Sequence, residues 1–299
     1  MTPSDRSGRV LSVGRLYCDL IFTGLPKMPT LGEEVFAGGL SIKPGGGAFI
    51  TAAYLAALGR PVTLASALPS GPFAAALKSE LEASGVDLSA SEPSPDGADP
   101  QITVAMAAGA ERAFLTRRSG PAVPASFAAV LADGGFAHLH IGELATLVEA
   151  PSLVPLARSA GLTISLDCSW DDAVLARDDL AALIASVDVF LPNETEADRL
   201  GIAERAPPPA PLTVVKRGAQ GSVALNAEGA VFVKARPVEV IDSTGAGDAF
   251  NAGFVDAWLS GQPVERCLRA GNRCGAEAVT RIGGATDLPD LSQLFTQSA

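Results

Sequence analysis

The 299-residue sequence has few basic residues, few cysteines and no long apolar stretch. Its 22 lysines and arginines are outnumbered by 33 aspartates and glutamates, which gives a formal net charge of -11. This balance argues against nucleic acids and anionic membranes as partners, because phosphates and acidic lipids attract basic surfaces. It does not exclude a nucleotide that is held by a metal ion and by backbone amides.

The sequence also lacks segments that would direct a chain to or through a membrane. No apolar run approaches the roughly 18 residues of a membrane span, and the polar residues 1–9 lack the apolar core of a signal peptide. The four cysteines, at positions 18, 168, 267 and 274, are scattered and show no metal-ligand spacing. We therefore expect a cytoplasmic protein with reduced thiols in its core.

Short apolar runs separated by longer helical segments account for most of the 47% apolar content. The runs expected to be strands are 10–13, 62–67, 137–141, 162–166, 187–191 and 212–215, with a hairpin at 223–233. Strands that alternate with helices predict a parallel sheet covered on both faces. We expect one domain over residues 1–299, a three-layer α/β/α sandwich with a mostly parallel central sheet.

Two segments interrupt this alternation. Strand-like runs occur at 17–22 and 32–42, and residues 102–116 form a hairpin with a turn at 108–110. We expect residues from about 17 to 44 and from 99 to 118 to form a small separate β-sheet, a lid over the main sheet. A small sheet cannot bury both of its faces by itself, and exposed strand edges tend to pair with other strands. We therefore expect the lid also to form a homodimer contact.

The strongest chemical signal is the run DSTGAGDAF over residues 242–250. A strand over 238–241 is expected to lead into this glycine-rich turn, which opens a helix over 246–259. The first amides of a helix are unpaired and carry partial positive charge, so an anion can bind there. Asp248 can accept a proton from an attacking hydroxyl while the neighbouring amides hold the transferring group. The alternative is an ordinary strand-to-helix turn with an acidic first-turn residue.

This run resembles the C-terminal signature of the PfkB (ribokinase) family of carbohydrate kinases. Further motifs follow the order of that family: Gly45-Gly46-Gly47 before a helix, Asn193-Glu194-Thr195-Glu196, Val215-Lys216-Arg217-Gly218 with Gly221, and Val279-Thr280-Arg281 with Gly283. Together they span residues 10 to 287. The resemblance implies a ribokinase-like fold and an ATP-dependent kinase that uses Mg²⁺ to phosphorylate a hydroxyl of a small molecule.

The resemblance also implies roles for individual residues. Asp248 would be the catalytic base, and the anion hole would consist of Gly245, Ala246 and Gly247. The nucleotide side would include Asn193, Glu196, Lys216, Gly218, Gly221 and Asn272, with Glu196 acting on Mg²⁺ through water. A potassium ion would be held by Asp242, Thr244, Ala278, Arg281 and Gly283. The acceptor would meet Asp19, Gly45, Gly46 and Thr51.

Several of these residues have simpler interpretations. Asn193 and Glu196 also fit a helix N-cap with its capping box, a role that is compatible with metal binding. Lys216 and Asn272 could be surface residues, and Asp242 could merely cap its turn. A solvated charge at a strand end is the simpler interpretation for the aspartate at position 19.

The acceptor side departs from the family pattern. Many sugar kinases of the family have an asparagine where this chain has Ile50, and several carry an arginine shortly after the equivalent of Asp167. We expect a small sugar or sugar acid as substrate, with a nucleoside as the alternative because Phe49, Ile50 and Phe114 could face a base. A non-catalytic sugar- or nucleotide-binding relative is the alternative from another class, which the intact Gly-Ala-Gly-Asp run disfavours.

Overall fold

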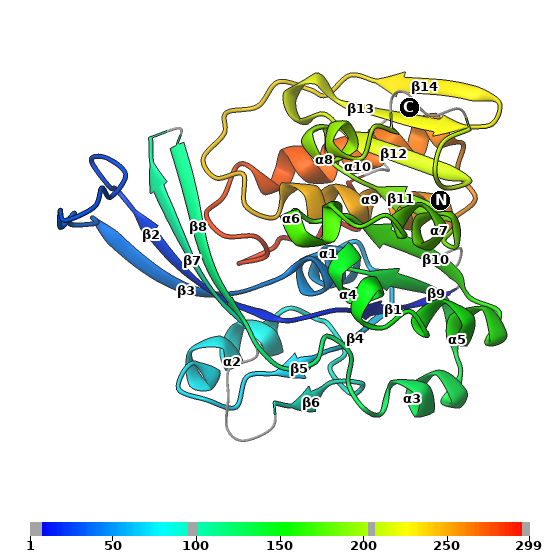
Figure 1. Cartoon of the computed structure of the whole chain (residues 1–299), viewed down its shortest axis with the longest axis horizontal. Coiled ribbons are helices and arrows are strands. Elements are labelled where there is room, and N and C mark those ends of the chain that lie inside the picture. Colours follow the sequence, from blue (N-terminus) through cyan, green and yellow to red (C-terminus); the bar gives the residue numbers. More distant parts are fainter. Residues whose placement is uncertain (1–7, 95–100, 110, 203–206, 295–299) are drawn as a thin grey trace.

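A large sheet runs through the middle of the molecule, which we describe from a computed structural model covering residues 8–94, 101–109, 111–202 and 207–294 (Figure 1). In this described part, the sheet has eight strands in the order β14-β13-β12-β11-β10-β9-β1-β4. They are β1 (Arg9–Val13), β4 (Val62–Ala65), β9 (Phe136–Ile141), β10 (Thr163–Asp167), β11 (Val189–Leu191), β12 (Leu212–Lys216), β13 (Ser222–Asn226) and β14 (Gly229–Val233). The strands from β12 to β4 are parallel, and β13 and β14 form an antiparallel edge.

Helices cover both faces of this sheet, as the apolar pattern predicts. Leu11 and Val13 of β1 face one hydrophobic core, whereas Val10 faces another, because successive strand residues point in opposite directions. The first core is closed by α3 (Phe127–Asp133), α4 (Leu144–Glu149), α5 (Leu153–Ser159), α6 (Asp172–Leu175), α7 (Leu180–Ala185) and α8 (Glu194–Arg199). The opposite face is covered by α1 (Gly47–Ala57), α2 (Ala74–Ala83), α9 (Ala246–Leu259) and α10 (Val264–Ala278). The three-layer α/β/α prediction is confirmed.

A second sheet projects from one side of the main body (Figure 1). Its strands, in the order β3-β2-β7-β8, are β3 (Gly39–Gly45), β2 (Tyr17–Thr23), β7 (Gln101–Ala108) and β8 (Glu111–Arg118). We call these four strands the lid sheet; residues 99, 100 and 110 of the predicted lid lie outside the described residues. The expected strand over 32–42 begins only at Gly39, and the short strands β5 (Ala67–Leu68) and β6 (Glu92–Pro93) form a separate pair.

Helices α1 and α9 run side by side in the same direction, and this brings the two glycine turns together. Near their C-terminal ends, Arg60 Nε donates to Asp256 Oδ1 at 2.6 Å, and both side chains are buried. At their N-terminal ends, a Cβ on Gly47 would lie only 3.0 Å from Asp248 Oδ1. Removing one partner of a buried ion pair leaves the other charge uncompensated, so this link holds the two helices in register.

Two further findings concern the predictions about membranes and cysteines. In the part of the chain that the structure describes, no helix has the length and apolar character needed to cross a membrane. The cysteines at positions 18, 168, 267 and 274 are all buried, as expected for core thiols.

Candidate active site

The turn before helix α9 has the geometry of an anion site. Gly245 precedes the helix with φ 72°, a left-handed conformation that favours glycine. A Cβ at this position would also lie 2.7 Å from Gly284 Cα, so glycine is required on two grounds. A Cβ on Gly247 would lie 3.4 Å from the Nζ of Lys216, which places an ammonium group beside the helix N-terminus. A phosphate would fit this combination of amides, helix dipole and positive charge.

Asp248 lies in the first turn of α9, directly after the glycines. Burial raises the pKa of its carboxyl well above the ordinary value, and the charge of Asp167 and a hydrogen bond with Asp167 raise it further. Lys216 acts in the opposite direction. A carboxylate with a raised pKa is a stronger base once it is ionised, which suits a group that must take a proton from a hydroxyl.

Two neighbours of this carboxylate were not predicted from the sequence. Asp167 is the last residue of β10, and its Oδ1 accepts a 2.7 Å hydrogen bond from Lys216 Nζ. The same ammonium donates to Asn251 Oδ1 at 3.1 Å, one helical turn beyond Asp248. Burial lowers the pKa of Lys216, but Asp167 and Glu196 outweigh it, so the ammonium stays charged. The position of Asp167 at the C-terminal end of a parallel strand is the sequence signal that could have revealed it.

Asn193 and Glu196 form the capping box of α8, which was one of their two predicted roles. Asn193 Oδ1 accepts from the amide of Glu196 at 2.9 Å, and Glu196 Oε2 accepts from the amide of Asn193 at 2.8 Å. Burial raises the pKa of Glu196 to about 7, with a further contribution from Asp167. The cap therefore places a carboxylate near Asp167 and Lys216, where oxygen donors suit Mg²⁺.

In the described part of the chain, side chains alone do not form a complete set of metal ligands. Among the described residues, no group of three or more His, Cys, Asp or Glu side chains is arranged to hold a metal ion. Mg²⁺ usually retains several waters and is bound through one or two carboxylates together with substrate phosphates. The pair of Asp167 and Glu196 fits that pattern, because a divalent cation would offset both the burial and the repulsion from Asp167 that raise the pKa of Glu196.

Of the remaining residues predicted for the nucleotide side, Gly218 and Gly221 lie between β12 and β13, and Asn272 lies in α10. Gly221 has φ 110°, and a Cβ there would collide with the carbonyl of Val233 at 2.1 Å. Gly218 has φ 53° and open space around it. Asn272 of α10 donates to the same Val233 carbonyl at 3.1 Å. These contacts give Gly221 and Asn272 a structural role in tying α10 to the sheet edge, whatever they bind.

On the acceptor side, Asp19 and the glycine run lie against each other. A Cβ on Gly45 would lie 2.0 Å from Asp19 Oδ2, so the carboxylate occupies the space that any other side chain would need. Gly46 has φ 94°, and a Cβ there would meet the carbonyl of Arg15 at 2.5 Å. Burial raises the pKa of Asp19 to about 7. Its Oδ1 is buried without a hydrogen-bond partner among the described residues, as expected for a group that awaits a ligand hydroxyl.

The first turns of α1 do not present side chains to the acceptor as the sequence suggested. Thr51 is fully buried, and its hydroxyl donates to the backbone carbonyl of Asp248 at 3.2 Å. Phe49 and Ile50 belong to the hydrophobic core, and Ile50 packs against the positions of Gly245 and Gly284. The expectation that Phe49 and Ile50 face a base is therefore wrong. Thr51 is placed to fix the backbone of Asp248.

A further polar pair at the base of the lid sheet was also missed. The hydroxyl of Tyr17, in β2, donates to Glu143 Oε2 at 2.6 Å, and Glu143 directly precedes α4. Burial raises the pKa of the Tyr17 phenol well above its usual range, and Glu143 adds to this. Arg15 lies 3.6 Å from Glu143 Oε1. This pair connects the lid sheet to the C-terminal end of β9.

The residues predicted to hold a monovalent cation come together in two facing loops. Asp242 Oδ1 accepts from the amide and hydroxyl of Thr244 at 2.9 and 2.8 Å, while its Oδ2 accepts from the amide of Gly283 at 2.9 Å. The Ala278 carbonyl accepts from the amide of Arg281 at 3.3 Å. The two loops are thus joined by one carboxylate, next to the anion site.

The segment before this loop corrects one prediction. Residues 238–241 form no strand, and Val238, Val240 and Ile241 are 43%, 60% and 58% exposed. The amides of Ile241 and Asp242 instead donate to the carbonyl of Val279, at the end of α10. The chain therefore reaches the glycine turn as an extended loop across α10 and pairs with no strand.

The chain is similar to a known protein family over most of its length. Residues 8–291 match the model of the pfkB family carbohydrate kinases. The chain belongs to this family. It is 25% identical over 296 residues to a ribokinase of Bacillus subtilis, a match that covers 94% of this chain and 96% of that protein.

Other relatives of this pfkB family chain match over a shorter stretch. An uncharacterized sugar kinase of Archaeoglobus fulgidus is 33% identical over 42% of this chain and 54% of its own length. A nucleoside kinase of Methanothermobacter thermautotrophicus is 30% identical over 46% of each chain. This chain thus spans about half the length of these two relatives.

Solved structures share the fold. A fructokinase double mutant from Vibrio cholerae O395, with fructose, ADP and a potassium ion bound, has a TM-score of 0.73 to this chain at 23% identity. The match covers 97% of this chain and 98% of that chain. The ribokinase-like fold that the sequence resemblance implied is confirmed.

Proposed function

We propose that the protein is an ATP-dependent kinase that transfers the γ-phosphate to a hydroxyl of a small sugar, sugar acid or nucleoside. One observation carries the proposal: the glycine run at 45–47 lies between two carboxylates, Asp19 and Asp248, and the second of these stands at the N-terminus of α9. An acceptor held against the glycines by Asp19 would have a hydroxyl within reach of Asp248. The names of the relatives, which include ribokinase and nucleoside kinase, agree with this acceptor class.

Each residue then has a defined task. Asp248 takes the proton of the acceptor hydroxyl as its oxygen forms a bond to the γ-phosphorus, and the bond from that phosphorus to the β-phosphate oxygen breaks to release ADP. The backbone of Gly245, Ala246 and Gly247 and the ammonium of Lys216 stabilise the charge on the transferring group. Bound Mg²⁺, held partly through water by Glu196 and Asp167, would shield the phosphates during this step.

The charges around the acceptor side favour a substrate without a phosphate group. Lys43 of β3 shares the face of the lid sheet that carries Asp19, but its ammonium is paired with Glu80 at 2.6 Å. Arg117 pairs in register with Ile102 and therefore points to the opposite face from Asp19. The Asp19 carboxylate would repel a dianionic phosphate when ionised. We therefore expect free sugars, sugar acids or nucleosides to be better substrates than phosphosugars.

Two finer features belong to the same proposal. The loops joined by Asp242 are proposed to bind potassium, the ion held by the related Vibrio cholerae fructokinase structure. The lid sheet is proposed to contact a second copy of the chain.

ADP release measured with ATP, Mg²⁺ and a panel of sugars, sugar acids, nucleosides and phosphosugars tests the proposal. We expect acceptor-dependent ADP release that disappears in the Asp248→Asn variant. A reaction without acceptor serves as the control for ATP hydrolysis. Binding of acceptors without ADP release in any combination would instead indicate a ligand-binding relative.

A further inference from the structure

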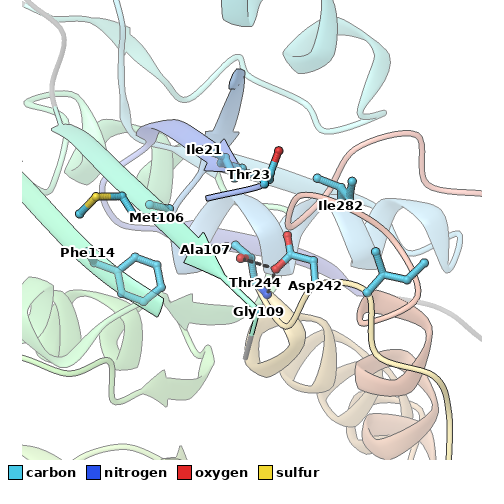
Figure 2. A pocket seen from close by; sticks show the side chains of 12 residues that line it. Ile21, Thr23, Met106, Ala107, Gly109, Phe114, Asp242, Thr244 and Ile282 are labelled. Atoms are coloured by element: carbon cyan, nitrogen blue, oxygen red, sulfur yellow. Dashed lines mark hydrogen bonds between the residues drawn. The ribbon is translucent and has the colours of Figure 1, made fainter. Parts of the chain in front are cut away.

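A pocket of about 240 Å³ opens between the lid sheet and the loop that leads to the anion site (Figure 2). Complete sites for small molecules usually enclose about 300–1,000 Å³. The pocket therefore suits one part of an acceptor and not the whole. Thr244, which lines it, directly precedes Gly245, so the pocket lies beside the region where phosphoryl transfer is proposed.

The face of the lid sheet above this pocket changes from polar to apolar along the strands. Residues paired across strands point to the same face. One such row is Asp19–Thr103–Thr116, and the next row on that face is Ile21–Ala105–Phe114. The two rows are two residues apart along each strand, or about 6.6 Å. A ligand lying along this face would meet a hydroxyl-binding row first and an apolar row second.

Exposed apolar side chains surround the outer part of the pocket. Phe114 is 61% exposed, and across from it Ile282 is 49% exposed (Figure 2). Ile241, which also lines the pocket, is 58% exposed. Large side chains of this kind that gather around one hollow indicate a binding surface. None of the described lining residues is basic, and the one acidic residue, Asp242, is bonded to Thr244 and Gly283.

We propose, building on the kinase function above, that the acceptor is a nucleoside-like molecule whose uncharged flat ring occupies this pocket against Phe114. Its sugar would lie over the polar row with Asp19, and its base over the apolar row. A sugar that extended from the polar row into this pocket would place hydroxyl groups against Ile21 and Phe114, where they lose water without gaining a partner. A sugar acid would place a carboxylate near Asp242, and the described lining residues include no basic side chain to balance it.

Binding of matched ligands tests this proposal independently of turnover. Calorimetry can compare the affinities of four ligands that share one sugar and differ in the group at its anomeric carbon: ribose, methyl riboside, uridine and adenosine. Mg²⁺ and a nonhydrolysable ATP analogue are included so that the nucleotide side is filled. We expect at least one of the nucleosides to bind about tenfold or more tightly than ribose or methyl riboside, the range that base stacking on an aromatic ring gives.

Two variants show whether Phe114 provides this contact. Phe114→Ala should lose about tenfold in nucleoside affinity and leave ribose affinity within twofold. Phe232→Ala is the control, because Phe232 is also a half-exposed strand phenylalanine, at 53%, but lies in β14 at the far edge of the main sheet. It should change neither affinity.

The possible outcomes separate this inference from the proposed function. If ribose binds as tightly as both nucleosides, or if Phe114→Ala weakens all ligands equally because it only helps the lid to close, the inference is overturned and the kinase proposal stands. If no acceptor supports ADP release, the kinase proposal fails, and nucleoside binding that depends on Phe114 would still support the assignment of the pocket.

Discussion

Three carboxylates and one ammonium share a small volume at the candidate active site. Asp167 contributes to the raised pKa values of both Asp248 and Glu196, and Lys216 opposes both shifts. Burial, the largest cause, penalises ionised carboxylates that water would otherwise solvate. Without nucleotide and metal, the cluster therefore holds fewer negative charges at neutral pH than its composition suggests. Binding of a divalent cation would favour the ionised forms, including the Asp248 carboxylate that the reaction needs.

Replacing the proposed base tests its role directly. Asp248→Asn should lower turnover by roughly 10²–10⁴, the usual contribution of a positioned base, while nucleotide affinity changes little. A folded-state pKa above the unfolded value means that the ionised carboxylate destabilises the fold at higher pH, so the variant should melt at the same or a higher temperature at pH 8. Rates and thermal unfolding measure both effects. Near-normal turnover would remove Asp248 from the mechanism.

The neighbouring aspartate should, in addition to burial, raise the pH at which the base becomes active. Since the pKa of Asp248 is raised, turnover should fall as pH decreases through a value above the roughly 4 of an exposed aspartate. Asp167→Asn removes the charge and hydrogen bond that raise this pKa, so the acidic limb of the pH–rate profile should move to lower pH. Asp179→Asn, at an exposed ion pair with Arg177, is the control. An unchanged limb in Asp167→Asn would contradict the coupling.

The role of a single residue could be predicted from the sequence where the groups that it acts with are its neighbours in the chain. Asp248 and its glycines are adjacent in the chain, and their roles follow from a helix N-terminus. The contact between Lys216 and Asp167 joins positions 49 residues apart, and only the place of both residues at the C-terminal ends of parallel strands suggests that they lie at the same edge of the sheet. Ile50 lies on a helix that is apolar almost all round, so the sequence did not show which neighbour it packs against.

At the scale of elements, α9 has the predicted bounds because glycine and a first-turn acid fix its start and Gly261 follows its end. The strands of the main sheet match to within a few residues for a similar reason: they are apolar and end at turn residues. The prediction of a strand at 238–241 was wrong, because an apolar segment in the sequence does not show whether a neighbouring strand is available to pair with it. Here the amide of Ile241 bonds to the end of α10 instead.

The two loops beside the anion site make a prediction about salts. Asp242 holds both loops through Thr244 and Gly283, and a monovalent cation beside it would reinforce the positive field around a phosphate. We expect turnover to be higher in potassium than in sodium or tetramethylammonium chloride at equal ionic strength. Equal rates in the three salts would remove the cation and leave the kinase proposal intact.

At the scale of the whole molecule, the lid sheet has one face toward the pocket and a second face of very different character. Its outer rows are Ile42–Leu20–Val104–Leu115 and Leu40–Phe22–Met106–Ala113, all apolar. A contiguous apolar surface of this kind usually indicates an interface with another molecule. The strong acidic charge of the chain does not extend into these rows.

A second copy of the chain is the partner that this outer face predicts. Packing two such faces would bury both sets of rows and would hold each lid sheet over its own pocket, so assembly and acceptor binding would be linked. Light scattering at micromolar concentration should give a dimer. Leu40→Asp, a change at a 55% exposed position of the outer face, should shift it to monomer and raise the KM of the acceptor more than that of ATP. Phe232→Asp, at a comparably exposed position of β14, should leave the dimer intact. A wild-type monomer under these conditions would contradict the prediction, since the exposed side chains of Leu40 and Leu115 on the outer face would then remain in contact with water.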